Sequence, residues 1–370
     1  MKKTIDRAFF AVFFLLWMVL TVWNGLKKPA EFSENENRYL TKFPSFTWDS
    51  FIEGEFMEKV DSYLNDQFLA RDSWISAQSI SEFAIGKRES NGVYIGKGAL
   101  LSKTEKPDMK TIDDNISGIN AFSKKYALKS YLLIVPDAAA VQSEKLPSFA
   151  ADWGELAVID DIYSRAQKTV GIDAASALGA HKQEYIFYRT DHHWTTYGAY
   201  LAYSAYCDAA GLKPADYRAD KVSESFNGTL YSKSGVRFQN SDTIEAFDTA
   251  FDGGCLVMDG ADNKKYDSVY FEEYLEKKDK YAYFLGPNKP IITMYGTGET
   301  GKKLLVFKDS YFHCLAPMLL EHYDEITLVD LRYLSAGLGD IVNPTEYDEV
   351  LYLYSLDTFV HQNVLIKLGL

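Results

Sequence analysis

The chain contains little cysteine, and its basic residues are outnumbered by acidic ones. Its 370 residues include three cysteines, Cys207, Cys255 and Cys314. At least one thiol therefore stays unpaired, and the fold does not depend on a disulfide framework. A single disulfide, for example between Cys255 and Cys314, requires that the fold brings the two residues together. No Cys/His spacing typical of structural zinc occurs. The formal net charge of −13 and the lack of a basic run argue against nucleic acid as a partner.

The N-terminus carries an export pattern. Lys2, Lys3 and Arg7 precede the apolar run "AFFAVFFLLWMVLTVWNGL" at residues 8–26. A basic start followed by an apolar run of this length predicts a signal that is also long enough to span a bilayer. No small-x-small cleavage pattern follows, so we expect an uncleaved anchor at 1–27. The prediction is a single-pass protein of the cell membrane whose C-terminal part lies outside the cytoplasm.

Beyond the anchor we expect a polar linker at 28–47 and one extracytoplasmic domain at 48–370. Apolar residues at helical spacing predict helices at 48–68, 73–85, 108–126 and 155–169, and another over "TYGAYLAYSAYCDAAG". The segment "NGVYIGKGALL" predicts a hairpin. Between about 213 and 299 the composition changes, which we interpret as an insertion of mixed β-strand and loop with the β-like runs "DSVYFEEYL", "KYAYFLG" and "KPIITMYG".

Strand-like runs alternate with helical ones elsewhere in the domain. "SYLLIV", "KKLLVF", "EITLV" and "DEVLYLYS" read as buried strands, and "LDTFVHQNVLIKL" reads as a final helix. This alternation predicts an α/β fold with a mainly parallel sheet flanked by helices. Ligands in such folds bind beyond the carboxyl ends of the strands. Asp137, Ser310, Arg332 and Ser355 all follow predicted strands.

An unusual tetrad, Asp191-His192-His193-Trp194, precedes the Tyr-Ala-rich helix and uses two of only six histidines. Imidazole titrates near neutrality, and a neighbouring carboxylate fixes its tautomer. Residues two apart in an extended segment point the same way, so Asp191 is placed to orient His193. We favour His193 as the base and give His192 a structural role. The reverse assignment remains open.

Ser310 ends the run "LLVFKDS" and begins the next predicted helix. A serine in this position is either a simple N-cap or a nucleophile presented at the sheet edge. Together with Asp191 and His193 it completes a Ser-His-Asp set, in which geometry matters rather than chain order. A metal site built on the tetrad is the weaker alternative, because no second cluster supplies further ligands. We therefore expect neither a metal nor a cofactor.

The tetrad in "TDHHWTTYGAY" resembles the signature of the DHHW protein family, which is related to the SGNH-hydrolase-like domains of alginate O-acetyltransferases. The blocks "ENRYLTKFP", "YLNDQFLARDSW", "NGVYIGKGALL", "LLIVPDAAAVQSEKLP" and "LLVFKDSYFHCLAPML" extend the resemblance over nearly the whole exported part. The resemblance implies an SGNH-hydrolase-like, flavodoxin-like fold with Asp191, His193 and Ser310 as the catalytic triad. It further implies O-acetylation of a cell-surface polysaccharide, with acetyl groups supplied by a multispanning membrane acyltransferase.

The sequence departs from the usual hydrolase pattern around its serine. Lys308-Asp309-Ser310 stands where Gly-Asp-Ser is usual, and no clear glycine and asparagine blocks supply an oxyanion hole. The Ser310 N–H, with Tyr311, is one candidate donor, and Asn343 and Ser355 are weaker ones. This gap keeps two alternatives open: a carbohydrate esterase that uses the same triad, and a non-catalytic glycan-binding or assembly factor.

Other residues are candidates for contacts with the glycan. Trp194 either supports its loop or stacks on a sugar. Arg332 and Tyr333 follow a predicted strand and suit an acidic or hydroxyl-rich glycan, although a surface ion pair explains Arg332 equally well. Tyr311 adjoins the candidate nucleophile. Asn227-Gly-Thr matches a glycosylation sequon, but we interpret it as a turn.

Overall fold

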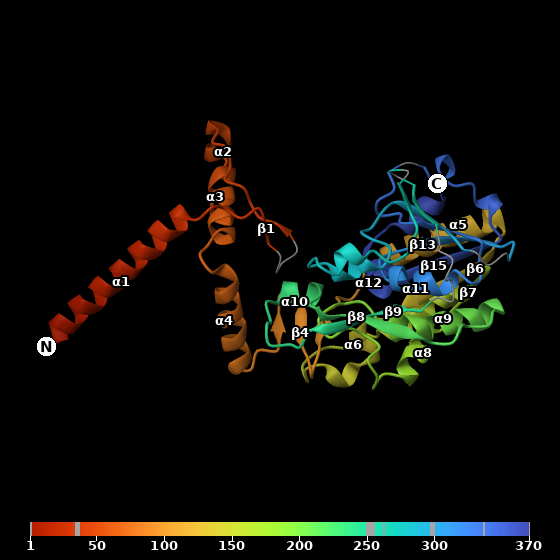
Figure 1. Cartoon of the computed structure of the whole chain (residues 1–370), viewed down its shortest axis with the longest axis horizontal. Helices are drawn as coiled ribbons and strands as arrows, with labels where there is room; N and C mark the ends of the chain where they lie inside the picture. The colour runs from red at the N-terminus through yellow and green to blue at the C-terminus, as the bar shows by residue number, and fades with distance from the viewer. Residues whose placement is uncertain are drawn as a thin grey trace. The chain divides into compact units, whose positions relative to one another are not determined.

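The computed structural model describes residues 2–33, 38–248, 256–260, 262, 264–296, 300–335 and 337–369. The chain forms two compact units. One consists of residues 1–87 with 235–237, and the other of residues 88–234 with 238–370. Figure 1 labels the elements of both units.

The first unit is mostly helical. Its elements are α1 (Lys2–Leu26), the short strands β1 (Phe32–Ser33) and β2 (Arg38–Tyr39), α2 (Trp48–Ile52), α3 (Glu55–Asp66) and α4 (Arg71–Ala84). The helix expected at 48–68 is thus divided into α2 and α3. The division falls at Gly54, whose φ of 84° is left-handed and incompatible with a continuing helix.

Helix α1 is long and apolar enough to cross a bilayer. Its segment Arg7–Leu26 spans 20 residues with a mean hydropathy of 2.0, and it is the one candidate span among the described residues. A helix with this length, composition and position is either a membrane anchor or an export signal.

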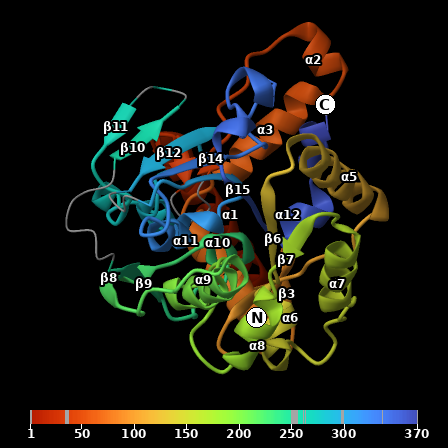
Figure 2. The ribbon, with the colours of Figure 1, turned by 90° about the vertical axis from the view of Figure 1, so that its right-hand side faces the viewer.

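The second unit is built around an eight-stranded sheet with the strand order β11-β10-β12-β14-β13-β15-β6-β7. Figure 2 shows the β10–β11 hairpin at one end and β7 at the other. The strands are β6 (Lys129–Val135), β7 (Thr169–Gly171), β10 (Leu256–Asp259), β11 (Lys264–Tyr266), β12 (Ile291–Tyr295), β13 (Lys303–Lys308), β14 (Glu325–Val329) and β15 (Glu349–Ser355).

The strands β14, β13, β15, β6 and β7 run parallel to one another. Strands β12, β10 and β11 extend the sheet with antiparallel pairings. The segment 213–299 therefore contributes an edge to the main sheet as well as a separate pair, β8 (Ala219–Phe226) with β9 (Asp242–Phe247). The carboxyl ends of the parallel strands lie at one edge, where an open α/β sheet binds its ligands.

Helices cover both faces of the sheet. Alternate side chains of β6 and β13 pack with α9 and α11 in one core, and the intervening side chains pack with α5, α7 and α12 in the other. The helices of this unit are α5 (Met109–Tyr126), α6 (Ala138–Val141), α7 (Glu155–Arg165), α8 (Ala174–Ala180), α9 (Thr196–Ala210), α10 (Thr229–Ser234), α11 (Phe312–Leu319) and α12 (Leu356–His361). A small sheet of β3 (Glu89–Ser90), β4 (Val93–Ile95) and β5 (Leu100–Ser102) contains the expected hairpin.

Predictions of local structure also differ from the observed elements in the C-terminal half of the chain. The runs "DSVYFEEYL" and "KYAYFLG" contain 3₁₀ turns, Glu272–Tyr274 and Lys280–Tyr283, in place of strands. The final helix ends at His361 and is followed by a 3₁₀ segment, η6 (Leu365–Gly369). In each case aromatic or aliphatic residues are buried by tertiary packing without regular strand or helix pairing, which residue preference alone does not reveal.

The cysteines contribute thiols to the interior. Cys207 and Cys314 are free and buried, and Cys255 lies outside the described residues. Burial raises the pKa of each of these two thiols to about 12. Both are therefore protonated at neutral pH and act as small apolar side chains.

A close helix contact gives a test of the packing. A Cβ at Gly118 on α5 would lie 2.0 Å from the Leu365 carbonyl oxygen, whereas a Cβ at Gly179 on α8 meets nothing within 4 Å. Gly118→Ala should lower the free energy of unfolding by about 1–3 kcal/mol. Gly179→Ala should be neutral or stabilise by up to about 1 kcal/mol. Thermal unfolding of the two variants measures both effects, and equal melting temperatures would contradict the contact.

Candidate active site

The tetrad lies on a loop that is held at both ends. Trp194 forms an isolated antiparallel bridge with Phe187, and the Tyr188 N–H donates to the His193 carbonyl oxygen at 3.2 Å. The loop then enters α9 through Thr195, whose hydroxyl accepts a hydrogen bond from the Gly198 N–H. The tetrad thus has a fixed backbone that precedes a well-capped helix.

A buried carboxylate fixes the start of this loop. Asp242 accepts hydrogen bonds from the Arg189 N–H and the Thr190 N–H, both at 2.8 Å. It also accepts from the Thr190 hydroxyl at 2.5 Å and the Tyr185 hydroxyl at 2.6 Å. The sequence gave no signal for this role, because Asp242 lies about fifty residues downstream on β9.

Asp191 and His193 lie side by side, as their spacing predicts. The Asp191 Oδ1 is 2.6 Å from His193 Nδ1, and it also accepts the His193 backbone N–H at 3.0 Å. Its other oxygen, Oδ2, accepts from the N–H and the hydroxyl of Thr229 at 2.7 and 2.9 Å. Both carboxylate oxygens are therefore satisfied, and the imidazole is held with Nδ1 toward the acid.

The opposite nitrogen of His193 reaches Ser310. His193 Nε2 lies 2.8 Å from the Ser310 Oγ, so the acid, the imidazole and the hydroxyl form one continuous chain. The Tyr281 ring stacks on the imidazole with centroids 3.8 Å apart and an interplanar angle of 10°. Its hydroxyl donates to the Ser310 carbonyl oxygen at 3.2 Å. Tyr281 thus contacts two members of the chain, although the sequence pattern did not single it out.

Burial sets the charge of this chain of groups. It lowers the pKa of His193 to about 4, with further lowering from His192 and partial opposition from Asp191. Burial alone would favour protonated Asp191, but the two imidazoles and the Thr229 N–H outweigh it and hold the pKa of that acid well below its usual value. At neutral pH His193 is neutral with Nε2 free to accept a proton, and Asp191 is ionised.

The two histidines occupy different positions. His192 Nδ1 lies 2.8 Å from the Thr229 hydroxyl, and its half-exposed ring stands at a cavity. The structure pairs His193, and not His192, with Ser310.

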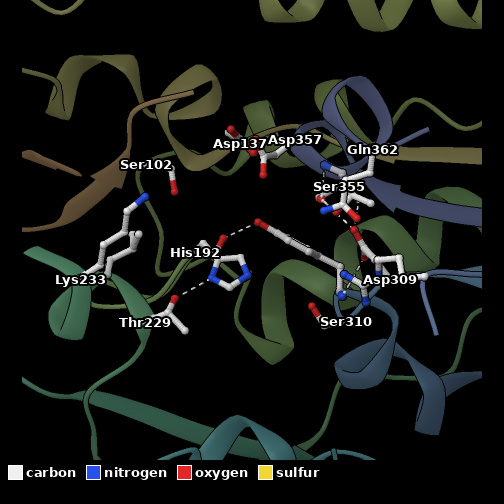
Figure 3. A pocket seen from close by; sticks show the side chains of 14 residues that line it. Ser102, Asp137, His192, Thr229, Lys233, Asp309, Ser310, Ser355, Asp357 and Gln362 are labelled. Atoms are coloured by element: carbon white, nitrogen blue, oxygen red, sulfur yellow. Dashed lines mark hydrogen bonds between the residues drawn. The ribbon is translucent and has the colours of Figure 1, made fainter. Parts of the chain in front are cut away.

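The cavity beside Ser310 has a volume of about 280 Å³. Figure 3 shows Asp309, Ser310 and Ser355 on one side of it and Thr229 and Lys233 on the other. The ends of β6, β13, β14 and β15 all contribute to its wall. The lining residues are Ser102, Asp137, His192, Thr229, Leu230, Lys233, Asp309, Ser310, Tyr311, Arg332, Ser355, Asp357, Thr358 and Gln362.

The residues expected to contact a glycan separate into two groups. Tyr311 and Arg332 line the cavity. Trp194 is fully buried, and its indole N–H donates to the Tyr311 carbonyl oxygen at 3.0 Å. Tyr333 is exposed, does not line the cavity, and has the Arg332 guanidinium 5.5 Å from its ring centroid.

Of the candidate oxyanion donors, some are already hydrogen-bonded, one lies away from the cavity, and one is available. Ser355 donates both its N–H and its hydroxyl to Asp309, at 2.8 and 2.7 Å. The Tyr311 N–H donates to the same carboxylate at 3.0 Å. Asn343 is exposed, caps a 3₁₀ turn and does not line the cavity. Within the described part of the chain, no group accepts a hydrogen bond from the Ser310 N–H, which leaves this donor available.

A metal at the tetrad would compete with these hydrogen bonds. The ligand atoms of Asp191, His192 and His193 lie within 4.8 Å of one another. However, both ring nitrogens of His193 are engaged, one with the acid and one with Ser310. Asp191 is also fully satisfied by hydrogen-bond donors, so the donor set fits a proton relay better than a metal.

Comparison with known proteins agrees with the fold. The model of the DHHW protein family matches residues 111–329, more than half of the chain. The chain belongs to the DHHW protein family. The expected SGNH-hydrolase-like α/β fold is likewise confirmed. No curated protein matches the chain.

Several solved structures are similar to this DHHW protein. A DHHW family protein from Eubacterium siraeum is 26% identical with a TM-score of 0.66, over 76% of this chain and 97% of that chain. Bacillus cereus PatB1 is 18% identical with a TM-score of 0.60, over 74% and 98%. The O-acetyltransferase domain of Pseudomonas putida AlgJ is 16% identical with a TM-score of 0.48, over 74% and 93%.

The turn that we inferred at Asn227-Gly-Thr provides a test of the acid's position. A Cβ at Gly228 would lie 2.3 Å from the Asp191 Oδ2. Gly228→Ala should therefore displace Asp191, remove the low-field proton resonance of the His193 Nδ1–H, and lower stability by about 1–3 kcal/mol. Proton NMR and thermal unfolding measure the two effects. Gly179→Ala is the matched control, and an unchanged resonance in Gly228→Ala would refute the assigned contact.

Proposed function

We propose that this DHHW protein is an extracytoplasmic O-acyltransferase that acetylates a cell-envelope polysaccharide. The observation that carries the proposal is the continuous chain from Asp191 through His193 to Ser310 at the wall of a cavity. A neutral imidazole between an ionised acid and a hydroxyl is the arrangement that activates a serine for acyl transfer.

In the first half of the reaction, the Ser310 Oγ attacks the acetyl carbonyl carbon of an ester or thioester donor. His193 Nε2 takes the hydroxyl proton, and the carbonyl π electrons move to oxygen to give an oxyanion. The Ser310 N–H is available to stabilise this charge. Collapse of the intermediate breaks the bond to the donor's leaving group, which receives the proton from His193. The product is acetyl-Ser310.

In the second half, a polysaccharide hydroxyl replaces the leaving group. His193 removes the proton of this hydroxyl, whose oxygen attacks the acetyl carbon. The bond to Ser310 then breaks, and His193 returns the proton to the Ser310 Oγ. Throughout both halves Asp191 stabilises the imidazolium without taking the proton.

The cavity wall suits a hydroxyl-rich acceptor. Asp137 and Asp357 supply carboxylates, and Ser102 and Gln362 supply neutral polar groups. Such groups accept and donate hydrogen bonds to sugar hydroxyls at defined positions. Burial raises the pKa of Asp137 to about 6, so this acid is mostly ionised at neutral pH.

In this proposal α1 anchors the protein in the cell membrane with the second unit outside. The anchor keeps the site near the bilayer, where a multispanning membrane acyltransferase delivers acetyl groups. The acceptor is a cell-surface polysaccharide. The same residues would give a carbohydrate esterase if water were the acceptor, and the two activities are separated by measuring acetyl transfer and hydrolysis with and without glycan.

Removing the nucleophile gives the main test. Ser310→Ala should lower acetyl transfer at least about 10³-fold and abolish labelling by a fluorophosphonate probe, with an unchanged melting temperature. Ser102→Ala is the matched control, because Ser102 lines the same cavity without an imidazole partner. Its labelling should persist. Retained transfer in Ser310→Ala would overturn the mechanism, and absence of labelling in the native protein would favour a non-catalytic factor.

The pH profile tests the base. The base must be neutral, so kcat/KM should fall tenfold per unit below the pKa of His193, at about pH 4, and be flat up to neutrality. The cavity holds a second group that titrates on the acid side, Asp137, with a pKa of about 6. An acid limb near pH 6 that disappears in Asp137→Asn would assign the profile to Asp137 and contradict the role of His193.

A further inference from the structure

Arg332 and Ser310 occupy equivalent positions on neighbouring strands. Strands β13 and β14 are parallel, and Phe307 is paired with Val329. Ser310 and Arg332 each lie three residues beyond this pair, and both line the same cavity. The register therefore places the guanidinium group on the β14 side of the candidate nucleophile.

The guanidinium is held in one orientation. Arg332 Nε donates to the Asp330 Oδ1 at 2.9 Å, and Nη2 donates to Oδ2 at 2.7 Å. Asp330 is fully buried. This two-point contact fixes the plane of the group. Nη1 has no acceptor among the residues that the structure describes, so its N–H groups remain available at the cavity.

Asp330 is also held by an ion pair with Lys308. The Lys308 Nζ is fully buried, 3.5 Å from the Asp330 Oδ2 and 2.7 Å from His313 Nε2. Burial lowers the pKa of Lys308 to about 8, which leaves it mainly protonated at neutral pH. A buried cation requires a paired acid, so Lys308 and Arg332 share Asp330 between them. The lysine of the Lys308-Asp309-Ser310 block thereby positions Arg332.

The donors of Ser355 and Tyr311 are already engaged. Asp309 accepts both Ser355 donors and the Tyr311 N–H. The dashed lines in Figure 3 show Ser355 joined to Asp309. The Tyr311 hydroxyl donates to the His192 carbonyl oxygen. Among the described residues, neither the Ser310 N–H nor the Arg332 Nη1 has an acceptor, so both remain as candidate donors at this cavity.

We propose that Arg332 is the second oxyanion donor, hydrogen-bonding through Nη1 to the acetyl carbonyl oxygen while the Ser310 Oγ attacks the carbonyl carbon. The inference rests on the proposed function and assigns Arg332 to the transition state instead of to the glycan. The group is cationic and fixed in advance, so it stabilises developing negative charge without reorganising. Its contribution should appear in kcat and leave KM nearly unchanged.

The test uses the full chain in detergent and p-nitrophenyl acetate as substrate. Arg332→Ala should lower kcat about 10²–10³-fold with KM within about threefold. Added guanidinium ion should restore part of the lost kcat, a rescue that a merely structural role would not give. Arg332→Lys should retain intermediate activity, because lysine keeps the charge but lacks the fork that binds Asp330. Melting temperatures identify any variant that does not fold, and in that case Arg332→Lys supplies the kcat and KM comparison.

The possible contrary results distinguish failure of the role of Arg332 from failure of the proposed function. A rise in KM with unchanged kcat would assign Arg332 to substrate binding and overturn the inference while Ser310 chemistry stands. An unaltered kcat would overturn it as well. Lys233→Met removes another cation from the cavity wall, and an equal loss of kcat there would attribute the effect to general charge. A native protein with neither turnover nor Ser310 labelling would refute the proposed function itself.

Discussion

The Asp191 carboxylate is buried and is stabilised by four hydrogen bonds, two from His193 and two from Thr229. The rest of the site depends on this charge. An unpaired buried carboxylate costs several kcal/mol or takes up a proton, so the tetrad loop and the start of α10 must bring their donors to it. The Asp191 carboxylate holds His193 Nδ1, so the ring is fixed with Nε2 toward Ser310. A shift of Asp191 would move every group that follows.

A second network of buried charge supports the nucleophile from the opposite side. Lys308 and Arg332 share Asp330, and Asp309 accepts three hydrogen bonds from Tyr311 and Ser355. The first network fixes the orientation of the base, His193. The second fixes the backbone next to Ser310 and the position of the Arg332 guanidinium. The second network lies at the carboxyl ends of β13, β14 and β15, and the first meets it there through the contact of His193 with Ser310. The sheet therefore gives the rigid frame on which the two networks meet.

Much of the fold could be predicted from residue pattern. Apolar runs identified β6, β13, β14 and β15, and apolar residues at helical spacing predicted α5 and α9. The aromatic stretches at 272–274 and 280–283 were wrongly predicted as strands. Tyr281 packs on His193 there, and local preference contains no information about a partner so distant in sequence. These two segments, Glu272–Tyr274 and Lys280–Tyr283, form 3₁₀ turns, which the local sequence did not indicate.

The sequence by itself determined the chemistry that is available: an acid and an imidazole two residues apart, a serine after a buried strand, and an apolar helix at the N-terminus. It also identified the protein family. Only the tertiary structure decided which histidine faces Ser310, that Trp194 is buried, and that Thr229, Tyr281 and Asp242 hold the site. The physical reason is that hydrogen bonding and burial depend on distances between segments far apart in the chain, such as His193 and Ser310, which are 117 residues apart. Spacing along the chain does not specify those distances.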